Sequence, residues 1–247
     1  MADCRLCNED RKLRKSHIYP EFLYKPLYDE KHKYFSLTTD TDKYIKQPSK
    51  GIYEELLCAD CEQKLSVYEG YARDVIYEKM KEALKEKGRV LKLTGIDYAL
   101  YKLFQLSLLW RSSIHSRPEL PVLNLGTHQE RLRKMILEED PGEYYQYGVI
   151  HISLQMPEEL GDDFLFPLEA VEGRFEGHHM YRSIIAGLSW SYIVSNHTYE
   201  VGFKEAFLNS KGELLIVRDY GPGNRFLNRL MNDFASHPGM KRFNHHF

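Results

Sequence analysis

The sequence predicts an α+β protein in which a small cysteine-containing module precedes helices and a mixed α+β domain. Three observations predict this order. Two Cys-x-x-Cys pairs lie within the first 61 residues, segments with a helical period follow them, and alternating segments rich in β-branched residues begin after residue 140. We therefore expect a module at residues 1–70, a helical region at 71–140 and an α+β domain at 141–247.

The composition is that of a globular protein with nearly balanced charge. Of 247 residues, 43% are hydrophobic, and 34 basic residues are balanced by 36 acidic ones, for a net charge of -2. This balance excludes a polycation that binds nucleic acid through its overall charge, so any such contact must come from a local patch. The N-terminus lacks the apolar core of a secretory signal, and the most apolar stretch, 98–110, is too short to span a bilayer. We expect a cytoplasmic protein with no membrane partner.

Three helices are predicted before residue 142. In 63–87, apolar residues recur at gaps of mostly three, four and seven. The second helix, 95–116, is apolar on most sides and is expected in the interior, with Asp97 as its N-cap. The third begins at Thr127, where Glu130 three residues later fits a capping box.

Three basic residues lie at the C-terminal end of the second of these helices. They are Arg111, His115 and Arg117. Positive charge suits the C-terminal end of a helix, where the backbone carbonyls lack partners. We expect a structural role for all three.

The last part of the chain predicts strands or buried apolar elements, at 147–156, 163–171, 182–196 and 212–220. The run 184–194 fits a buried helix equally well, because a short apolar run does not separate the two. His151 alternates with Ile150 and Ile152 and is expected to face solvent or a polar neighbour. A short helix is predicted within 223–239.

The strongest chemical signal is the set of four cysteines, Cys4, Cys7, Cys58 and Cys61. Each Cys-x-x-Cys turn directs two thiolates at one ion, and two such turns complete a tetrahedron. In a reducing compartment, this spacing favours metal over disulfides. Four sulfur ligands leave no open position, so we expect a structural zinc ion. The alternative is a group of ordinary buried cysteines or a redox pair.

Around these cysteines, the segments "CRLC", "SHIYP" and "LLCADCEQK" resemble the zinc-bearing form of the HNH endonuclease superfamily. The resemblance covers about residues 1–70. It implies a ββα-metal fold, in which two short strands and a helix surround one catalytic divalent cation. It also implies that His17 is the general base. Two positions depart from the family pattern: Ser16 stands where an acidic metal ligand is usual, and Glu62 stands where the helix usually carries Asn or His.

The chemistry that the resemblance implies is hydrolysis of a phosphodiester with Mg²⁺ or Mn²⁺. Glu62 is the first candidate ligand for that cation, and Glu69, seven residues on and on about the same helical face, is the reserve. DNA is the expected substrate, RNA is the alternative, and defence against foreign DNA is the implied role. Five basic residues are candidates for the phosphate backbone: Arg11, Lys12, Arg14, Lys15 and Lys64.

Two other interpretations stay open. The near-neutral charge and Ser16 favour a catalytically inactive, zinc-stabilised module that binds nucleic acid or a protein. The bound protein would be a different partner or a second copy of this chain. Ser16 and His17 would then form hydrogen bonds inside the module. The other is a structural subunit whose C-terminal domain carries a separate activity.

Overall fold

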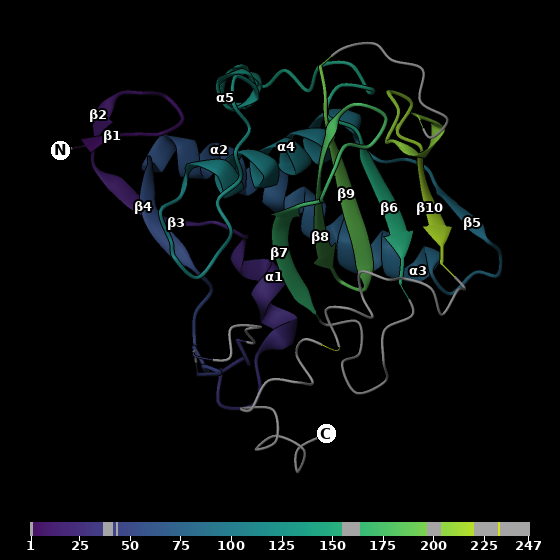
Figure 1. Ribbon diagram of the computed structural model, residues 1–247, viewed down its shortest axis with the longest axis horizontal. Coiled ribbons are helices and arrows are strands. Elements are labelled where there is room, and N and C mark those ends of the chain that lie inside the picture. Colours follow the sequence, from purple (N-terminus) through teal and green to yellow (C-terminus); the bar gives the residue numbers. More distant parts are fainter. Residues whose placement is uncertain are drawn as a thin grey trace.

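The computed structural model describes residues 2–36, 42, 44–154, 164–196, 204–219 and 232. It shows a mixed α+β fold built around a six-stranded sheet of order β5-β10-β6-β9-β8-β7 (Figure 1). All neighbours in this sheet are antiparallel except β10 and β6, which are parallel. The strands are β5 (Val90–Leu93), β6 (Val149–Ser153), β7 (Leu165–Ala170), β8 (His179–Ile185), β9 (Leu188–Val194) and β10 (Leu214–Arg218).

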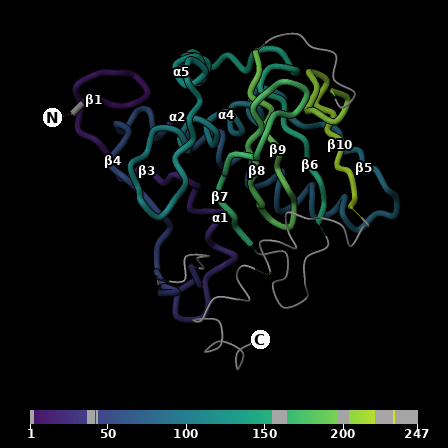
Figure 2. Tube along the Cα trace, viewed as in Figure 1, coloured from purple at the N-terminus to yellow at the C-terminus, as the bar shows by residue number. Residues whose placement is uncertain are grey.

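The α4 helix, Tyr98–Ile114, is the centre of the core. Every residue from Tyr101 to Ser113 is buried, which confirms the predicted interior helix. The side chain of Asp97 accepts a hydrogen bond from the Leu100 amide at 3.0 Å, so the predicted N-cap is also confirmed. One face of α4 packs on the sheet, where the ring of Phe104 meets that of Trp190, and other faces contact α2 and α5 (Figure 2).

The helix predicted at 63–87 is one continuous helical stretch with three segments: α2 (Ala59–Asp74), a π-helical turn (Val75–Met80) and α3 (Lys81–Ala83). It begins earlier than predicted because Cys58 occupies the N-cap, so Cys61 already lies in the first turn. The second Cys-x-x-Cys pair is therefore the start of the helix and not a separate loop.

The α5 helix, His128–Glu138, confirms the third predicted helix but not its capping box. Thr127 occupies the N-cap position, yet its side chain makes no capping hydrogen bond. Glu130 instead forms an ion pair with Arg133 at 2.7 Å, one turn further along the helix. The predicted capping box is wrong because Thr127 has helical backbone angles, φ -65° and ψ -18°, whereas a capping residue adopts an extended conformation that directs its side chain at the following amides.

The ambiguous run at 184–194 consists of strands. β8 and β9 form a hairpin across Ala186 and Gly187, both with positive φ, at 51° and 73°. Positive φ at both central residues defines the two-residue turn that matches the twist of paired strands. The segments predicted at 147–156, 163–171 and 212–220 contain β6, β7 and β10, whereas nearly all of the helix predicted at 223–239 lies outside the described residues.

The expectation for His151 is wrong, because its side chain is fully buried. It faces α4 from β6 and packs against Trp190 with ring centroids 4.5 Å apart. Neither ring nitrogen has a hydrogen-bond partner of ordinary geometry among the described residues. Burial lowers the pKa of His151 to about 3, and the Val149 carbonyl opposes this only weakly. The alternating pattern identified the strand but did not reveal which face the helices cover.

The N-terminal elements form two small two-stranded sheets beside the helices (Figure 1). The larger one pairs β3 with β4 in antiparallel fashion, and α2 follows β4 without a break. These elements are β1 (Ala2–Asp3), β2 (Asp10–Arg11), β3 (Leu13–His17), α1 (Glu21–Tyr24), a 3₁₀ turn (Lys25–Leu27) and β4 (Tyr53–Cys58); a further 3₁₀ turn, Lys204–Ala206, precedes β10.

One hydrophobic core joins these parts. It runs from Cys4 and Leu6 in the N-terminal module through α4 to Ile216 on β10. β5 comes from the region predicted to be helical, yet it pairs with β10 in the C-terminal sheet. Among the described residues, no helix is both long and apolar enough to cross a membrane.

Candidate metal centre and the histidine beside it

The four predicted cysteines lie together where the turn that carries Cys4 and Cys7 meets the boundary between β4 and α2. Their Sγ atoms all lie within 4.8 Å of one another, and those of Cys7 and Cys58 are 4.0 Å apart, too far for a disulfide. Thiolates about 2.3 Å from a tetrahedral ion would be separated by about 3.8 Å, so the cluster fits one metal. In the described part of the chain, no other group of three or more Cys, His, Asp or Glu side chains has this geometry.

Burial and backbone donors shift the pKa values of the cluster's thiols in opposite directions. Burial is the main effect at Cys61 and raises its thiol pKa well above the ordinary value. Burial also acts on Cys4, but backbone N–H donors outweigh it and lower the pKa; the Cys58 amide lies 3.3 Å from the Cys4 sulfur. The raised pKa values of Cys7 and Cys61 keep these thiols protonated without a cation, so a bound metal ion would have to displace their protons.

A positively charged side chain from α5 also contacts the first Cys-x-x-Cys turn. Arg133 donates a hydrogen bond to the carbonyl of Leu6, which lies between Cys4 and Cys7. The module is therefore attached to the helical region at the cysteine cluster itself. This contact could not be predicted from the sequence, because no local pattern relates residues 127 positions apart.

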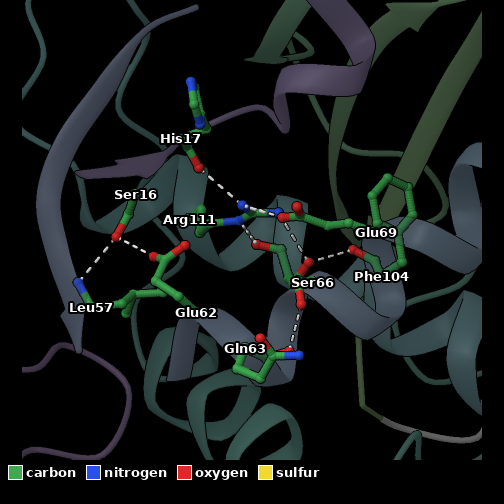
Figure 3. Close-up of polar contacts among 10 residues, drawn as sticks. Ser16, His17, Leu57, Glu62, Gln63, Ser66, Glu69, Phe104 and Arg111 are labelled. Atoms are coloured by element: carbon green, nitrogen blue, oxygen red, sulfur yellow. Dashed lines mark hydrogen bonds and ion pairs between the residues drawn. The ribbon is translucent and has the colours of Figure 1, made fainter. Parts of the chain in front are cut away.

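Ser16 holds the β3–β4 pair and α2 together. The register of the two strands shifts between Arg14 and Lys15, and the Leu57 amide at this bulge donates to the Ser16 hydroxyl at 3.1 Å. The same hydroxyl donates to the Glu62 carboxylate (Figure 3). Burial is the main reason that the pKa of Glu62 lies above its ordinary value. Ser16 and Glu62, the two positions that depart from the HNH pattern, are thus direct partners.

Replacing Ser16 with alanine is expected to destabilise the protein by about 1–3 kcal/mol, because it leaves a buried amide and a half-buried carboxylate without their partner. The matched control is Ser66→Ala on the exposed side of α2, where the hydroxyl only donates to the Gln63 carbonyl. Urea denaturation of both variants measures the difference. Equal stability of the two variants would show that Ser16 has no such role.

His17 is the last residue of β3, and its imidazole is half-buried and oriented by a carboxylate. Its Nε2 lies 3.0 Å from Oε2 of Glu21, and the hydroxyl of Tyr28 donates to the other oxygen of Glu21 at 2.7 Å. Burial lowers the pKa of His17, against the opposing charges of Glu21 and Glu69, and so favours the neutral form of the ring. A proton on Nε2 leaves the lone pair on Nδ1. No local pattern identified Glu21, because a spacing of four predicts a contact only within one helix, and His17 ends β3 whereas Glu21 begins α1.

Arg111 connects α4 to both β3 and α2. Its Nη1 donates to the His17 carbonyl at 2.9 Å and to Oε1 of Glu69 at 2.8 Å, and its side chain is only 3% exposed. Figure 3 shows its guanidinium group between Glu62 and Glu69. Glu69, the reserve ligand for a divalent cation, is therefore already paired. Glu62 lacks such an ion pair with Arg111, although the charge of Arg111 tends to lower its pKa.

The predicted phosphate-binding residues differ in availability. Arg11 is paired with Glu9 at 2.5 Å and with Asp60, and Lys64 donates to the Leu137 carbonyl at 2.7 Å and pairs with Glu139. The remaining three are exposed on or beside β3; these are Lys12, Arg14 and Lys15. The ammonium group of Lys15 lies 5.1 Å from the Tyr53 ring, which also contacts the His17 ring. Exposed basic charge and an aromatic ring therefore lie beside His17.

Comparison of the chain with family models, with curated proteins and with solved structures finds no match.

Proposed function

We propose that the β3–β4–α2 unit is a zinc-braced HNH-like module that hydrolyses phosphodiester bonds in nucleic acid, with DNA as its substrate and RNA as the alternative. One observation carries this proposal. The Ser16 hydroxyl near the end of β3 donates to the Glu62 carboxylate in the first turn of α2, and Glu62 directly follows Cys61 of the four-cysteine cluster. His17 follows Ser16 on β3, and its imidazole points away from Glu62 (Figure 3) and pairs with Glu21. The order of two strands, helix and cysteine turns is the one that the resemblance implies.

Zinc is the metal that best suits the cysteine cluster. Four thiolates in a tetrahedron are a common ligand set for structural Zn²⁺, and they leave no position for water or substrate. The role of this ion is therefore to hold the two Cys-x-x-Cys turns and, through the second turn, the start of α2. Glu62 follows Cys61 directly, so the ion also fixes where that carboxylate lies.

In the proposed reaction, His17 acts as the general base. Glu21 accepts a hydrogen bond from the Nε2–H group and keeps the ring in one tautomer, and Nδ1 takes the proton of the attacking water. The exposed cations Lys12, Arg14 and Lys15 hold the phosphates on either side of the bond that is cleaved. A base must be neutral before it takes a proton, and burial, by lowering the pKa of His17, favours that form.

Besides zinc, this chemistry requires a catalytic Mg²⁺ or Mn²⁺ ion, and the chain offers few ligands for it. Mg²⁺ is often bound through one or two carboxylates, with water and substrate phosphate completing its shell. Glu62 is the one candidate carboxylate, and the Ser16 hydroxyl is a neutral neighbour. A bound Mg²⁺ or Mn²⁺ would supply stabilisation of the charge that develops on the phosphate.

Arg111 favours a second candidate function, in which the module binds nucleic acid or a protein without cleaving it. Its guanidinium lies between Glu62 and Glu69 and is already paired with Glu69. A divalent cation near this arginine would be repelled by it. In this candidate function, the zinc ion and Arg111 shape a binding surface that includes the exposed basic residues beside β3.

Cleavage of supercoiled plasmid separates the two functions. With Mg²⁺ and then Mn²⁺, the wild-type protein is expected to nick or linearise DNA, and His17→Ala is expected to lower the rate by about 10²–10⁴-fold. The matched control is His179→Ala, at an exposed histidine at the start of β8. All three proteins must retain equal zinc. Absence of cleavage by the wild type on plasmid, single strands and RNA would reject the nuclease and favour the binding module.

A further inference from the structure

We propose that Arg111 is a positioning residue for His17, and that the functional unit therefore extends beyond residue 70 into α4. This inference rests on the proposed nuclease function. Arg111 lies 94 positions from His17 and outside the segment that resembles the HNH superfamily. From the sequence, only a structural role at the C-terminal end of a helix was expected for Arg111.

The contacts of Arg111 are placed to fix the end of β3. One nitrogen, Nη1, donates both to the carbonyl of His17 and to the carboxylate of Glu69. The other donors return to α4, where Nη2 lies 3.3 Å from the hydroxyl of Ser107 and Nε lies 3.4 Å from its carbonyl. The guanidinium thus joins β3, α2 and α4 at one point, directly behind the residue whose imidazole would take the proton.

Burial makes this contact stronger and more specific. The Arg111 side chain is 3% exposed, so its charge is screened little by solvent. A planar guanidinium has several donors in fixed directions, whereas the single ammonium of lysine is a compact point charge on a flexible chain. Only arginine can therefore hold both acceptors while remaining anchored on Ser107. A displacement of a catalytic group by about 1 Å can lower a rate by about 10²-fold.

A purely structural role must be distinguished from this one, and Tyr19 offers the matched control. Its buried hydroxyl lies 3.1 Å from the Ser112 hydroxyl on α4 and accepts from the Leu168 amide on β7 at 2.5 Å. Tyr19 is two residues from His17 and joins the module to α4, as Arg111 does, but its hydroxyl makes no contact with His17. Tyr19→Phe therefore weakens the same junction without releasing the His17 carbonyl.

The experiment measures kcat and KM for plasmid cleavage by the zinc-loaded full chain. Arg111→Met is expected to lower kcat by about 100-fold with KM within about 3-fold of wild type, because the base is misplaced while the binding surface is retained. Arg111→Lys is expected to recover part of this loss, and it also serves if Arg111→Met fails to fold. Tyr19→Phe is expected to lower the melting temperature but to leave kcat within about 3-fold of wild type.

Three results would overturn the inference. In the first, Arg111→Met, or Arg111→Lys in its place, lowers kcat no more than Tyr19→Phe does. In the second, the substitution of Arg111 raises KM and leaves kcat unchanged, which would make Arg111 part of substrate binding. The third is a wild-type protein that cleaves no nucleic acid, which rejects the proposed function and removes the basis of the inference with it.

Discussion

Removing the metal from the cysteine cluster is expected to lower the melting temperature by about 10–20 °C or more. The four cysteines join the first turn, the end of β4 and the start of α2, and Cys4, Cys58 and Cys61 belong to the continuous core. Structural zinc in small modules contributes about 10–16 kcal/mol of apparent binding free energy. For a chain of this size, each kcal/mol of lost stability lowers the melting temperature by about 2–4 °C. A loss of only about 5 kcal/mol in the free energy of unfolding would therefore lower the melting temperature by about 10–20 °C.

The expected measurement is thermal unfolding followed by circular dichroism, before and after treatment with a strong chelator. Cys58→Ser is the matched control, because it breaks the ligand set and should unfold at the lower temperature whether or not chelator is present. Its thiol belongs to the cluster in the native structure. An unchanged midpoint in the wild type after complete loss of metal would contradict a structural role for the ion.

The second large effect is expected at Lys102, a fully buried lysine on α4. Its ammonium group donates to the Tyr147 carbonyl at 2.9 Å. Burial lowers the pKa of Lys102 from 10.5 to about 7. Lys102→Met is therefore expected to stabilise the protein by roughly 2–4 kcal/mol at pH 7, because it removes a buried charge at the cost of one hydrogen bond.

The buried Lys102 makes the stability of the wild-type protein depend on pH. Between pH 7 and 10.5, the unfolded chain binds the Lys102 proton and the folded chain does not, so wild-type stability should rise with pH in this window. In this window, Lys102 changes the free energy of unfolding by about 1.4 kcal/mol per pH unit. Below pH 7, the full destabilisation of the folded protein by the buried Lys102 charge is present. The advantage of Lys102→Met over wild type should therefore shrink steadily as pH increases.

Lys79→Met is the matched control for this prediction. Lys79 also donates to a backbone carbonyl, that of Gly95 at 2.7 Å, but its side chain is exposed. Urea denaturation at several pH values from 7 to 10 measures all three proteins. If the free-energy difference between Lys102→Met and wild type does not change with pH, or if it matches that of Lys79→Met, the lysine is not held with a lowered pKa.

Local patterns predicted the features that depend on nearby residues. The spacing of the cysteines identified a cluster whose geometry fits one metal, and Asp97 before an apolar run identified a real N-cap. In both cases, the interacting groups are close in sequence or follow a fixed spacing. The period of apolar residues likewise located the helical stretch that begins with α2, although the stretch starts earlier than predicted.

The contacts that shape the candidate site could not be read in this way. Arg111 and Arg133 reach the module from helices that are adjacent to it only after folding. His151 was expected to be exposed or satisfied, because alternation along a strand does not show that α4 covers its face. Ser16 appeared to be a missing metal ligand, whereas the bulge that places it against the Leu57 amide depends on strand pairing across 41 positions. Long-range pairing sets these environments, and one sequence does not encode it in any local pattern.

The most direct test of the zinc-braced module is X-ray absorption at the zinc edge of the purified full chain, together with metal analysis. The account predicts one zinc per chain with four sulfur neighbours at about 2.3 Å. Substantially less than one zinc per chain, with the thiols of Cys4, Cys7, Cys58 and Cys61 free to titrate, would contradict it. A shell containing nitrogen or oxygen in place of sulfur would contradict it equally, because the ion would then not be held by these four thiolates alone.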